Sequence, residues 1–318
     1  MIAAPVAPFP TKDLVSLGDL DPDGLRLVLD TAREIKANVD AYRGLLHGKR
    51  LAMVFEKESL RTRFTFEIGM QDLGGSATFL DMSLGARMGA RESVRDMGKN
   101  FERWTHGIVA RTYRHRTVVE LAQAAQVPVI NGLSDLLHPC QALADTMTLF
   151  EHWGDVAGRR ITYIGDGNNT CHSLITACAK LGMRVTVCTP EGYEPDAEIE
   201  RAAIASAEET GGSYRLEHDP HLAAKGAEAI YTDVWASMGQ EDETEERAAI
   251  FADYAVNEPI MELTDHAVFM HCMPAHRGQE VSRGVIDGPR SIVFDIAENR
   301  LHAQKAVLAM LMGAEVEA

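Results

Sequence analysis

The sequence predicts an α/β protein made of two doubly wound parallel-sheet domains in series. Short apolar segments that suit buried strands alternate with amphipathic segments that suit helices along the chain. This alternation is typical of parallel sheets covered by helices on both faces. It stops once, at the polar segment 151–160, and then restarts. With 318 residues, the chain is long for one hydrophobic core and natural for two domains.

The first half of the chain begins with a well-marked helix. Asp21 can cap its first turn, Pro22 stands where a helix tolerates proline, and an apolar stripe follows at helical spacing. The stripe consists of Leu25, Val28, Leu29, Ala32 and Ile35. Strands then alternate with helices, and Gly74-Gly75 ends the first of these helices. The strands are expected at 51–55, 76–80, 107–111 and 127–131, and the helices at about 60–73, 92–104, 118–125 and 138–153.

The second half repeats the pattern after the polar boundary. Its strands are expected at 161–165, 184–188, 227–234, 267–272 and 291–295, and its helices at about 174–181, 196–211 and 298–312. The predicted domains are residues 1–150 together with a C-terminal helix at 298–318, and residues 151–297. Ligands of such sheets bind at the carboxyl ends of the strands and between domains, so an interdomain active site is expected.

The composition is that of an ordinary globular protein with an acidic balance. Hydrophobic residues make up 46% and charged residues 25% of the chain, and 31 Lys and Arg against 47 Asp and Glu give a net charge of −16. This charge repels phosphate backbones, so nucleic-acid binding is not expected. An anionic substrate would need a local cluster of Arg and His.

Targeting signals are not evident in the sequence. No stretch approaches the roughly 18 apolar residues of a membrane span, and the N-terminal segment lacks a basic region and is broken by prolines. The five cysteines are odd in number and have no zinc-ligand spacing. Reduced thiols in a cytoplasmic protein, without a metal, are therefore expected.

The first polar group follows the strand at 51–55. Ser59, Arg61, Thr62 and Arg63 stand where a helix begins. The free N–H groups and the dipole of a helix start favour an anion, and arginine offers a fork of donors to phosphate oxygens. By itself, this segment is equally consistent with a capped helix that carries solvated arginines.

Two further strands of the first half end in polar side chains. Arg111 and Thr112 end one of them, and His138 and Gln141 follow the next. His138 could polarise a carbonyl group and Gln141 could bind an amide. A histidine before a proline at a helix start is, however, more often a cap or a core contact.

A glycine pair in the second half offers a second kind of site. Gly165 and Gly167 follow a strand and resemble the beginning of a dinucleotide-binding loop, but Thr170 stands where the third glycine would be. A nucleotide cofactor is therefore a minor alternative. Asn168 and Asn169 could instead bind a substrate carboxylate or amine.

Two more strands of the second half end in reactive side chains. Asp233 is placed to accept from a cationic amine, with Ser237 a few residues further on, and a structural cap is the alternative interpretation. Cys272 stands between His271 and Pro274 at the end of a strand. Its thiol could be a nucleophile, or the residue could be a small buried one.

Seven segments in order make the chain resemble the ornithine carbamoyltransferase family along nearly its whole length. One such segment would be a coincidence, but seven in family order are specific. The first and third are shared by aspartate and ornithine carbamoyltransferases, whereas the fifth and sixth form the ornithine-type signature. The segments are SLRTR (59–63), ART (110–112), HPCQALAD (138–145), GDGNN (165–169), DVWASMGQE (233–241), HCMPAHRG (271–278) and AENR (297–300).

This resemblance implies a reaction and an assembly. The carbamoyl group of carbamoyl phosphate would pass to the side-chain amine of L-ornithine, giving L-citrulline and phosphate in arginine metabolism. Neither an organic cofactor nor a metal is implied. The family forms trimers with sites at subunit interfaces, so a homotrimer is expected.

The resemblance also assigns the site residues, which we give by their numbers in this chain. Carbamoyl phosphate would be bound through its phosphate by Ser59, Leu60, Arg61 and Thr62. Arg111 would bridge phosphate and carbonyl, His138 and Gln141 would hold the carbamoyl group, and Arg300 would complete the site. Cys272 and the backbone of Met273 would lie beside the reacting centre. Ornithine would be bound by Asn169, Asp233, Ser237 and Met238.

Catalysis would depend on positioning and on charge. Holding two substrates in line can supply several kcal/mol, and Arg111, Thr62 and His138 are suitable donors for the oxyanion that forms. The attacking amine has a pKa near that of lysine, about 10.4, and must lose a proton. Asp233 and a Cys272 thiolate are hypothesised to help it do so.

The sequence departs from the family pattern at three positions. Leu60 replaces a usual threonine, which matters little if that position contributes its backbone N–H. Cys140 stands where threonine is commoner. Arg87 stands where family members often carry a glutamine that reaches a neighbouring subunit's site, and an arginine can still meet a phosphate.

Three alternatives to this function remain open at this stage. Another carbamoyl acceptor such as putrescine is disfavoured because Asn169, Asp233 and Ser237 suit an α-amino acid. An NAD-dependent oxidoreductase is disfavoured by the missing third glycine. A non-catalytic paralogue is disfavoured because every chemically useful position is intact.

Overall fold

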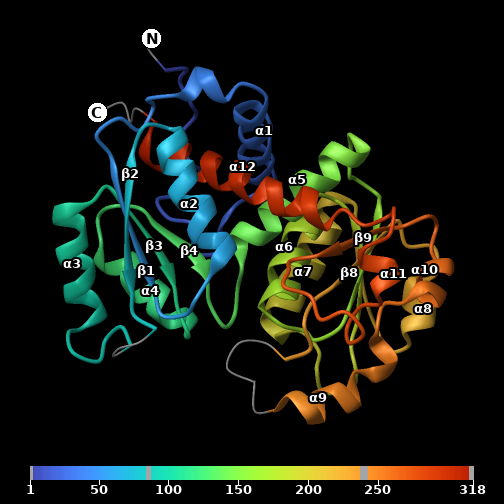
Figure 1. The fold of residues 1–318 in the computed structure, drawn as a ribbon. Coiled ribbons are helices and arrows are strands. Elements are labelled where there is room, and N and C mark those ends of the chain that lie inside the picture. The colour runs from blue at the N-terminus through green and yellow to red at the C-terminus, as the bar shows by residue number, and fades with distance from the viewer. Residues whose placement is uncertain (1–2, 84–86, 237–242, 315–318) are drawn as a thin grey trace. The chain divides into compact units, whose positions relative to one another are not determined.

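The computed structural model describes residues 3–83, 87–236 and 243–314, which form two compact units (Figure 1). Unit 1 contains residues 1–147 and 299–318, and unit 2 contains residues 148–298. Each unit holds one parallel sheet with helices, which confirms the predicted fold class. The functional assignment of the predicted domains, 1–150 with 298–318 and 151–297, stays a prediction.

Unit 1 is built on a four-stranded parallel sheet with the order β2-β1-β3-β4. The strands are β1 (Arg50–Phe55), β2 (Ser76–Asp81), β3 (Gly107–Arg111) and β4 (Val129–Leu133). β1 and β3 are buried over nearly their whole length, as expected for strands with helices on both faces. The carboxyl ends of β1, β3 and β4 carry the polar segments that the sequence singled out.

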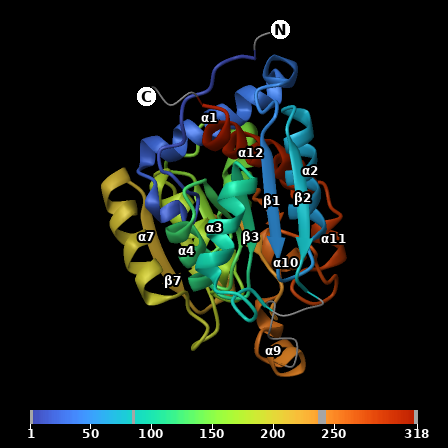
Figure 2. The same ribbon diagram turned by 90° about the vertical axis from the view of Figure 1, so that its left-hand side faces the viewer.

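The helices of unit 1 cover both faces of this sheet. The helices α3 (Val94–Trp104) and α4 (His115–Ala124) lie side by side (Figure 2) and share a core with Val54, Ile108 and Val129. The other helices that contribute to the unit are α1 (Pro22–Ala37), α2 (Leu60–Asp72), α5 (Pro139–Trp153) and α12 (Val293–Met312), with 3₁₀ turns η1 (Leu17–Asp19) and η2 (Val39–Tyr42). α5 and α12 each continue across the boundary between the units in sequence.

Unit 2 is built on a five-stranded parallel sheet with the order β7-β6-β5-β8-β9. Its strands are β5 (Arg160–Ile164), β6 (Arg184–Cys188), β7 (Ser213–Glu217), β8 (Ala229–Thr232) and β9 (Val268–His271). The order reverses direction at β5, which places the ends of β5, β8 and β9 next to one another. Ligands of doubly wound sheets collect at such a point.

The helices of unit 2 are of two kinds. The longer ones, α6 (Asn169–Lys180) and α7 (Ala197–Thr210), pack against each other, and α7 ends at Gly211 in the left-handed conformation. Short helices pack on residues such as Ile230 and Phe269 of the sheet. They are α8 (Pro220–Ala224), α10 (Glu258–Glu262) and α11 (Arg283–Ile286), while α9 (Thr244–Ile250) is followed by the 3₁₀ turn η4 (Ala252–Tyr254).

The strand predicted at 291–295 is wrong. Ser291 makes only an isolated bridge to Phe269, and α12 begins at Val293, five residues before the helix start expected at 298. Val293 is buried but Phe294 is 69% exposed, so the run is not enclosed as a central strand would be. A short apolar run is compatible with either element, and here the helical period prevails.

Within the described ranges, no helix combines the length and apolar character needed to cross a membrane.

The start of α1 provides a test of the local interactions in unit 1. The Asp21 carboxylate accepts a hydrogen bond from the backbone N–H of Gly24 at 2.6 Å. Asp21→Ala removes this cap and is expected to lower the free energy of unfolding by about 1 kcal/mol. Asp21→Asn keeps an acceptor oxygen and is expected to stay close to the wild type. Urea unfolding followed by circular dichroism measures both, and an equal loss in the two variants would contradict the capping role.

Candidate active site

The segment from Ser59 to Thr62 lies at the N-terminus of α2, directly after β1. Ser59 is the N-cap residue in extended conformation, and its hydroxyl makes no capping hydrogen bond to the helix. Leu60 points its side chain outward, with 69% exposed, whereas Thr62 is buried. The first turn therefore offers backbone N–H groups and two hydroxyls, a set that suits an oxyanion.

A buried arginine ties this helix start to two other helices of unit 1. Arg300, on α12, is 2% exposed. Its Nη1 donates to Oε1 of Gln141 on α5 at 2.7 Å, and its Nη2 donates to Oγ1 of Thr62 at 2.9 Å. The Gln141 amide in turn donates from Nε2 to Oδ1 of Asp145 at 2.9 Å. Three residues far apart in sequence thus form one hydrogen-bonded cluster.

His138 lies among positive charges at the beginning of α5. Burial, and then the charges of Arg300, Arg111 and Arg61, hold its pKa well below the usual range for histidine. Its imidazole is therefore neutral at physiological pH and can act as a hydrogen-bond donor from one nitrogen only. Arg111 itself is buried at the end of β3. Arg300, Arg111 and Arg61 thus make the surroundings of His138 a local cationic region in an acidic chain, as binding of an anion requires.

Arg87 stacks on the ring of Tyr113, whose backbone is held by Glu56, an acidic residue that sequence reasoning missed. The buried carboxylate of Glu56 accepts from the backbone N–H of Met88 at 2.7 Å and of Tyr113 at 2.8 Å. The Arg87 guanidinium lies 4.2 Å from the centre of the Tyr113 ring, and Lys57 Nζ lies 4.1 Å from the same centre. The signal that could have revealed Glu56 was a charged residue directly after a buried strand.

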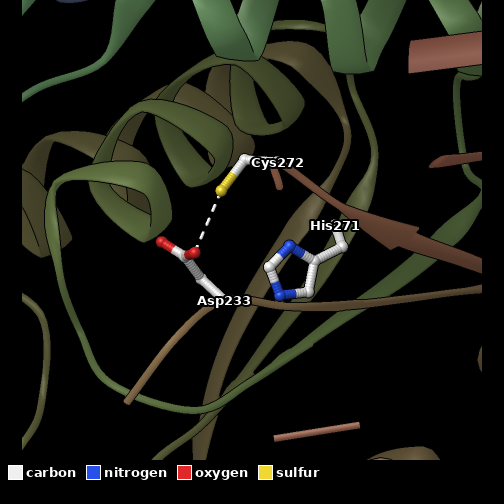
Figure 3. A group of neighbouring side chains, drawn as sticks. All are labelled: Asp233, His271 and Cys272. Atoms are coloured by element: carbon white, nitrogen blue, oxygen red, sulfur yellow. Dashed lines mark hydrogen bonds between the residues drawn. The ribbon is translucent and has the colours of Figure 1, made fainter. Parts of the chain in front are cut away.

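In unit 2, Asp233 is the centre of a second cluster. It follows β8 and is 5% exposed. Cys272 Sγ donates to its Oδ1 at 2.9 Å, as Figure 3 shows, and Asn168 Nδ2 donates to its Oδ2 at 3.0 Å. The thiol donates to a carboxylate in this arrangement, and the thiolate expected at Cys272 stays a prediction.

The two asparagines after β5 differ in their surroundings. Asn168 is the N-cap of α6, and its Oδ1 accepts from the backbone N–H groups of Thr170 and Cys171. Asn169, the residue assigned to ornithine by the resemblance, begins the helix and is half-buried. Ser237 and Met238, assigned to the same substrate, lie outside the described residues.

The residues around Cys272 have a defined backbone geometry. His271 is fully buried, and its Nδ1 accepts from the backbone N–H of Met273 at 2.8 Å. Met273 adopts a left-handed conformation with φ of 60°. The His271 Nε2 lies 3.4 Å from Oε1 of Glu280, which is also fully buried. The backbone N–H of Met273 is thereby held by a histidine that lies against a buried glutamate.

Asp233, His271 and Cys272 form a group that could hold a metal ion. Each offers one ligand atom, and these atoms lie within 4.8 Å of one another (Figure 3). Carboxylate, imidazole and thiolate are all zinc ligands. In this structure, however, the thiol donates to Oδ1 of Asp233 and Nδ1 of His271 accepts from Met273, so an atom of each of the three residues takes part in a protein hydrogen bond. The expected absence of a metal stays a prediction.

A buried ion pair lies beside this cluster in unit 2. Arg247 donates to Asp166 at 3.0 Å, to Glu243 at 2.8 Å and to the carbonyl oxygen of Trp235 at 2.9 Å. Burial raises the pKa of Asp166 to about 6, although the charge of Arg247 opposes this shift. This network links the loop after β5 to residues that precede and follow segment 237–242 in sequence.

Comparisons with known proteins agree over both units. The family model described as the aspartate/ornithine carbamoyltransferase carbamoyl-P binding domain matches residues 12–151, and that of the Asp/Orn binding domain matches residues 157–311. An ornithine carbamoyltransferase from Pyrococcus horikoshii is 52% identical over 309 residues, which are 95% of this chain and 96% of the relative. An anabolic ornithine carbamoyltransferase from Pyrococcus furiosus is 51% identical with the same coverage.

Solved structures give the same result. Ornithine carbamoyltransferase from Pyrococcus furiosus superposes with a TM-score of 0.93 at 48% identity and covers 99% of this chain and 100% of its own. An acetylornithine transcarbamylase complexed with acetylcitrulline is more distant, with a TM-score of 0.86 and 30% identity over 95% of this chain and 99% of its own.

The raised pKa of Asp166 predicts a pH dependence of stability. Because the folded state holds this proton more tightly than the unfolded chain, the contribution of Asp166 to stability falls as pH rises from about 4 to about 6. Asp166→Asn does not titrate. The free energy of unfolding of the wild type minus that of the variant is therefore expected to decrease across this window. Urea unfolding at several pH values measures it, and a difference that increases with pH would contradict the assignment.

Proposed function

The chain belongs to the aspartate/ornithine carbamoyltransferase family, and we propose on this premise that it transfers the carbamoyl group of carbamoyl phosphate to L-ornithine. The products are L-citrulline and phosphate, in arginine biosynthesis. The protein is a transferase, since relatives at about 50% identity over 95% of the chain are ornithine carbamoyltransferases. The observation that carries the proposal is the cationic cluster around Arg300 at the start of α2.

The proposed donor site uses the residues of unit 1. The phosphate is bound by the first turn of α2, through Ser59, the backbone N–H of Leu60, Arg61 and Thr62. Arg111 bridges the phosphate and the carbonyl oxygen, and His138, Gln141 and Arg300 hold the carbamoyl group. The hydrogen bonds from Arg300 to Gln141 and Thr62 support this set, because they fix both side chains before a ligand arrives. Arg87 is assigned a phosphate contact, with the stacking on Tyr113 fixing its starting position.

The proposed acceptor site uses the residues of unit 2. Asp233 binds the side-chain amine of ornithine, while Asn169, Ser237 and Met238 bind its amino-acid end. The position of Asp233 supports this role, because a buried carboxylate with two neutral hydrogen-bond donors keeps capacity for a cation. That the two sets of residues act on one pair of substrates is part of the proposal.

The reaction needs no covalent intermediate with the protein. The neutral amine of ornithine attacks the carbamoyl carbon, and the carbonyl oxygen gains negative charge. Arg111, Thr62 and the neutral His138 donate to this oxyanion. The bond to the phosphate oxygen then breaks, phosphate leaves, and the nitrogen loses a proton to give citrulline. A hydrogen-bond donor at an oxyanion of this kind is typically worth about 3 kcal/mol.

The side-chain amine is cationic in solution and must lose one proton before it attacks. This proton is additional to the one that the nitrogen loses after the attack. The Cys272 thiol donates a hydrogen bond to the Asp233 carboxylate at 2.9 Å. We propose that this pair orients the amine and accepts its proton, with Cys272 and the backbone of Met273 beside the reacting carbon. In the thiolate version of this hypothesis, the thiol first gives its proton to the Asp233 carboxylate, and the thiolate then accepts the proton of the amine.

Assembly and location complete the proposal. We infer a homotrimer from the family resemblance and a cytoplasmic protein from the cysteines. All five cysteines lie in the described part of the chain and none of them forms a disulfide bond, which supports a reducing compartment.

The first test is product formation from carbamoyl phosphate with ornithine, N-acetylornithine and putrescine in parallel. Citrulline from ornithine and little product from the other two amines are expected. Product mainly from putrescine or N-acetylornithine would keep the reaction class and overturn the acceptor. A folded protein without product from any amine would overturn the proposed function.

Cys272→Ser tests the thiol. If a thiolate takes part in deprotonation, the variant is expected to lose activity by roughly 10-fold or more and to shift the pH–rate profile, because general-base steps contribute about 10²–10⁴-fold. The profile of kcat against pH measures this. Full activity with an unchanged profile would exclude the thiolate and leave Asp233 as the proton acceptor.

A further inference from the structure

Asp145 has no role in the site as described so far. It lies on α5, one helical turn after Gln141, and is fully buried. Its Oδ1 accepts the hydrogen bond from Nε2 of Gln141 at 2.9 Å. A buried carboxylate is costly unless it is hydrogen-bonded, so its presence beside a substrate-binding amide calls for a physical explanation.

The hydrogen bonds of Gln141 define its orientation from both ends. Arg300 can only donate, so the amide must turn its oxygen toward Nη1, at 2.7 Å. Oδ1 of Asp145 accepts from the amide on the other side, so the amide must turn its nitrogen toward Oδ1. If the amide were reversed, its NH₂ group would face the N–H donors of Arg300, and its oxygen would face the acceptor Oδ1 of Asp145. Only one orientation of this amide is therefore compatible with both neighbours.

The fixed orientation decides what Gln141 offers to a ligand. Its carbonyl oxygen has two lone pairs, and Arg300 uses one of them. The second lone pair can accept from an N–H group. A carbamoyl group carries such N–H donors, whereas inorganic phosphate, which shares the phosphate half of the site, does not.

We propose that Asp145 is a positioning residue that holds Gln141 in the orientation that distinguishes a carbamoyl group from bare phosphate. This rests on the proposed function. Asp145 acts through Gln141 and touches neither substrate. Loss of Asp145 is expected to weaken only the binding of the carbamoyl half of carbamoyl phosphate. The contacts of the phosphate half with α2 and Arg111 do not depend on the Gln141 amide.

The test compares three substitutions of Asp145 by steady-state kinetics. Asp145→Ala removes the acceptor, Asp145→Leu removes it while filling the space, and Asp145→Asn keeps an acceptor oxygen. Ala and Leu are expected to raise KM for carbamoyl phosphate on the order of 10-fold, the effect of losing a hydrogen bond to a charged group. Asn is expected to restore most of the wild-type KM. The inhibition constant of inorganic phosphate and KM for ornithine are expected to remain near the wild-type values.

A merely structural role of Asp145 would give different results. Equal changes in the constants for carbamoyl phosphate and inorganic phosphate, or an Asn variant as impaired as the Ala variant, would overturn the proposal. If Ala does not fold, the Leu and Asn variants make the same comparison, and thermal denaturation of each variant identifies a stability defect.

A second arm uses Gln141→Ala as the background. Without the amide there is nothing for Asp145 to position, so adding Asp145→Leu is expected to raise KM for carbamoyl phosphate no further. A further rise of about 10-fold would show that Asp145 acts independently of Gln141 and would overturn the proposal. A wild-type protein that makes no citrulline would overturn the proposed function together with this proposal. An active wild-type protein whose Asp145 variants keep the wild-type KM for carbamoyl phosphate would overturn only the role of Asp145.

Discussion

The guanidinium of Arg300 imposes the constraint on which unit 1 depends. A buried positive charge must be hydrogen-bonded, and Arg300 meets this requirement through Gln141 on α5 and Thr62 on α2. These bonds join three helices at the carboxyl edge of the sheet. Gln141 and Thr62 are neutral, so neither of them cancels the charge of Arg300. After burial, this charge is the next cause that lowers the pKa of His138. Stability and affinity for an anion thus arise from the same group.

Unit 2 has the opposite local character. Asp233 is held by Asn168 and by the thiol of Cys272, and Asp166 is held by Arg247. Carboxylates at strand ends favour a cationic amine, as arginines at a helix start favour a phosphate. The division of the chain into two units is therefore also a division of charge, which matches an anionic donor and a cationic acceptor.

The sequence was sufficient for elements with a strong pattern and insufficient for contacts between distant residues. The stripe of α1 is buried as expected, because its apolar side chains recur with the helical period. The strand β7 was missed because its side chains are only partly buried at the edge of the sheet, and the run at 291–295 has no period long enough to separate strand from helix. The bond between Arg300 and Thr62 spans 238 positions, and local sequence does not encode such a distance. The motifs indicated which residues to consider, and Asp145 is the last residue of one of them, whereas the burial and the hydrogen-bond partners of Glu56 and Asp145 are defined only by the fold.

The discontinuity of unit 1 has a consequence for the order of events during synthesis. The residues of α12 that carry Arg300 leave the ribosome only after the whole of unit 2 has been made. At about 5–20 residues per second, this delay is roughly 8–30 s. Unit 2 is continuous and can fold during that time, while the first 147 residues still lack the helix that completes their core. Domains usually fold in order from the N-terminus, and this order of folding is therefore expected to be reversed in this chain. Unit 1 without α12 exposes apolar surface, and this incomplete state would be the one that most needs a chaperone.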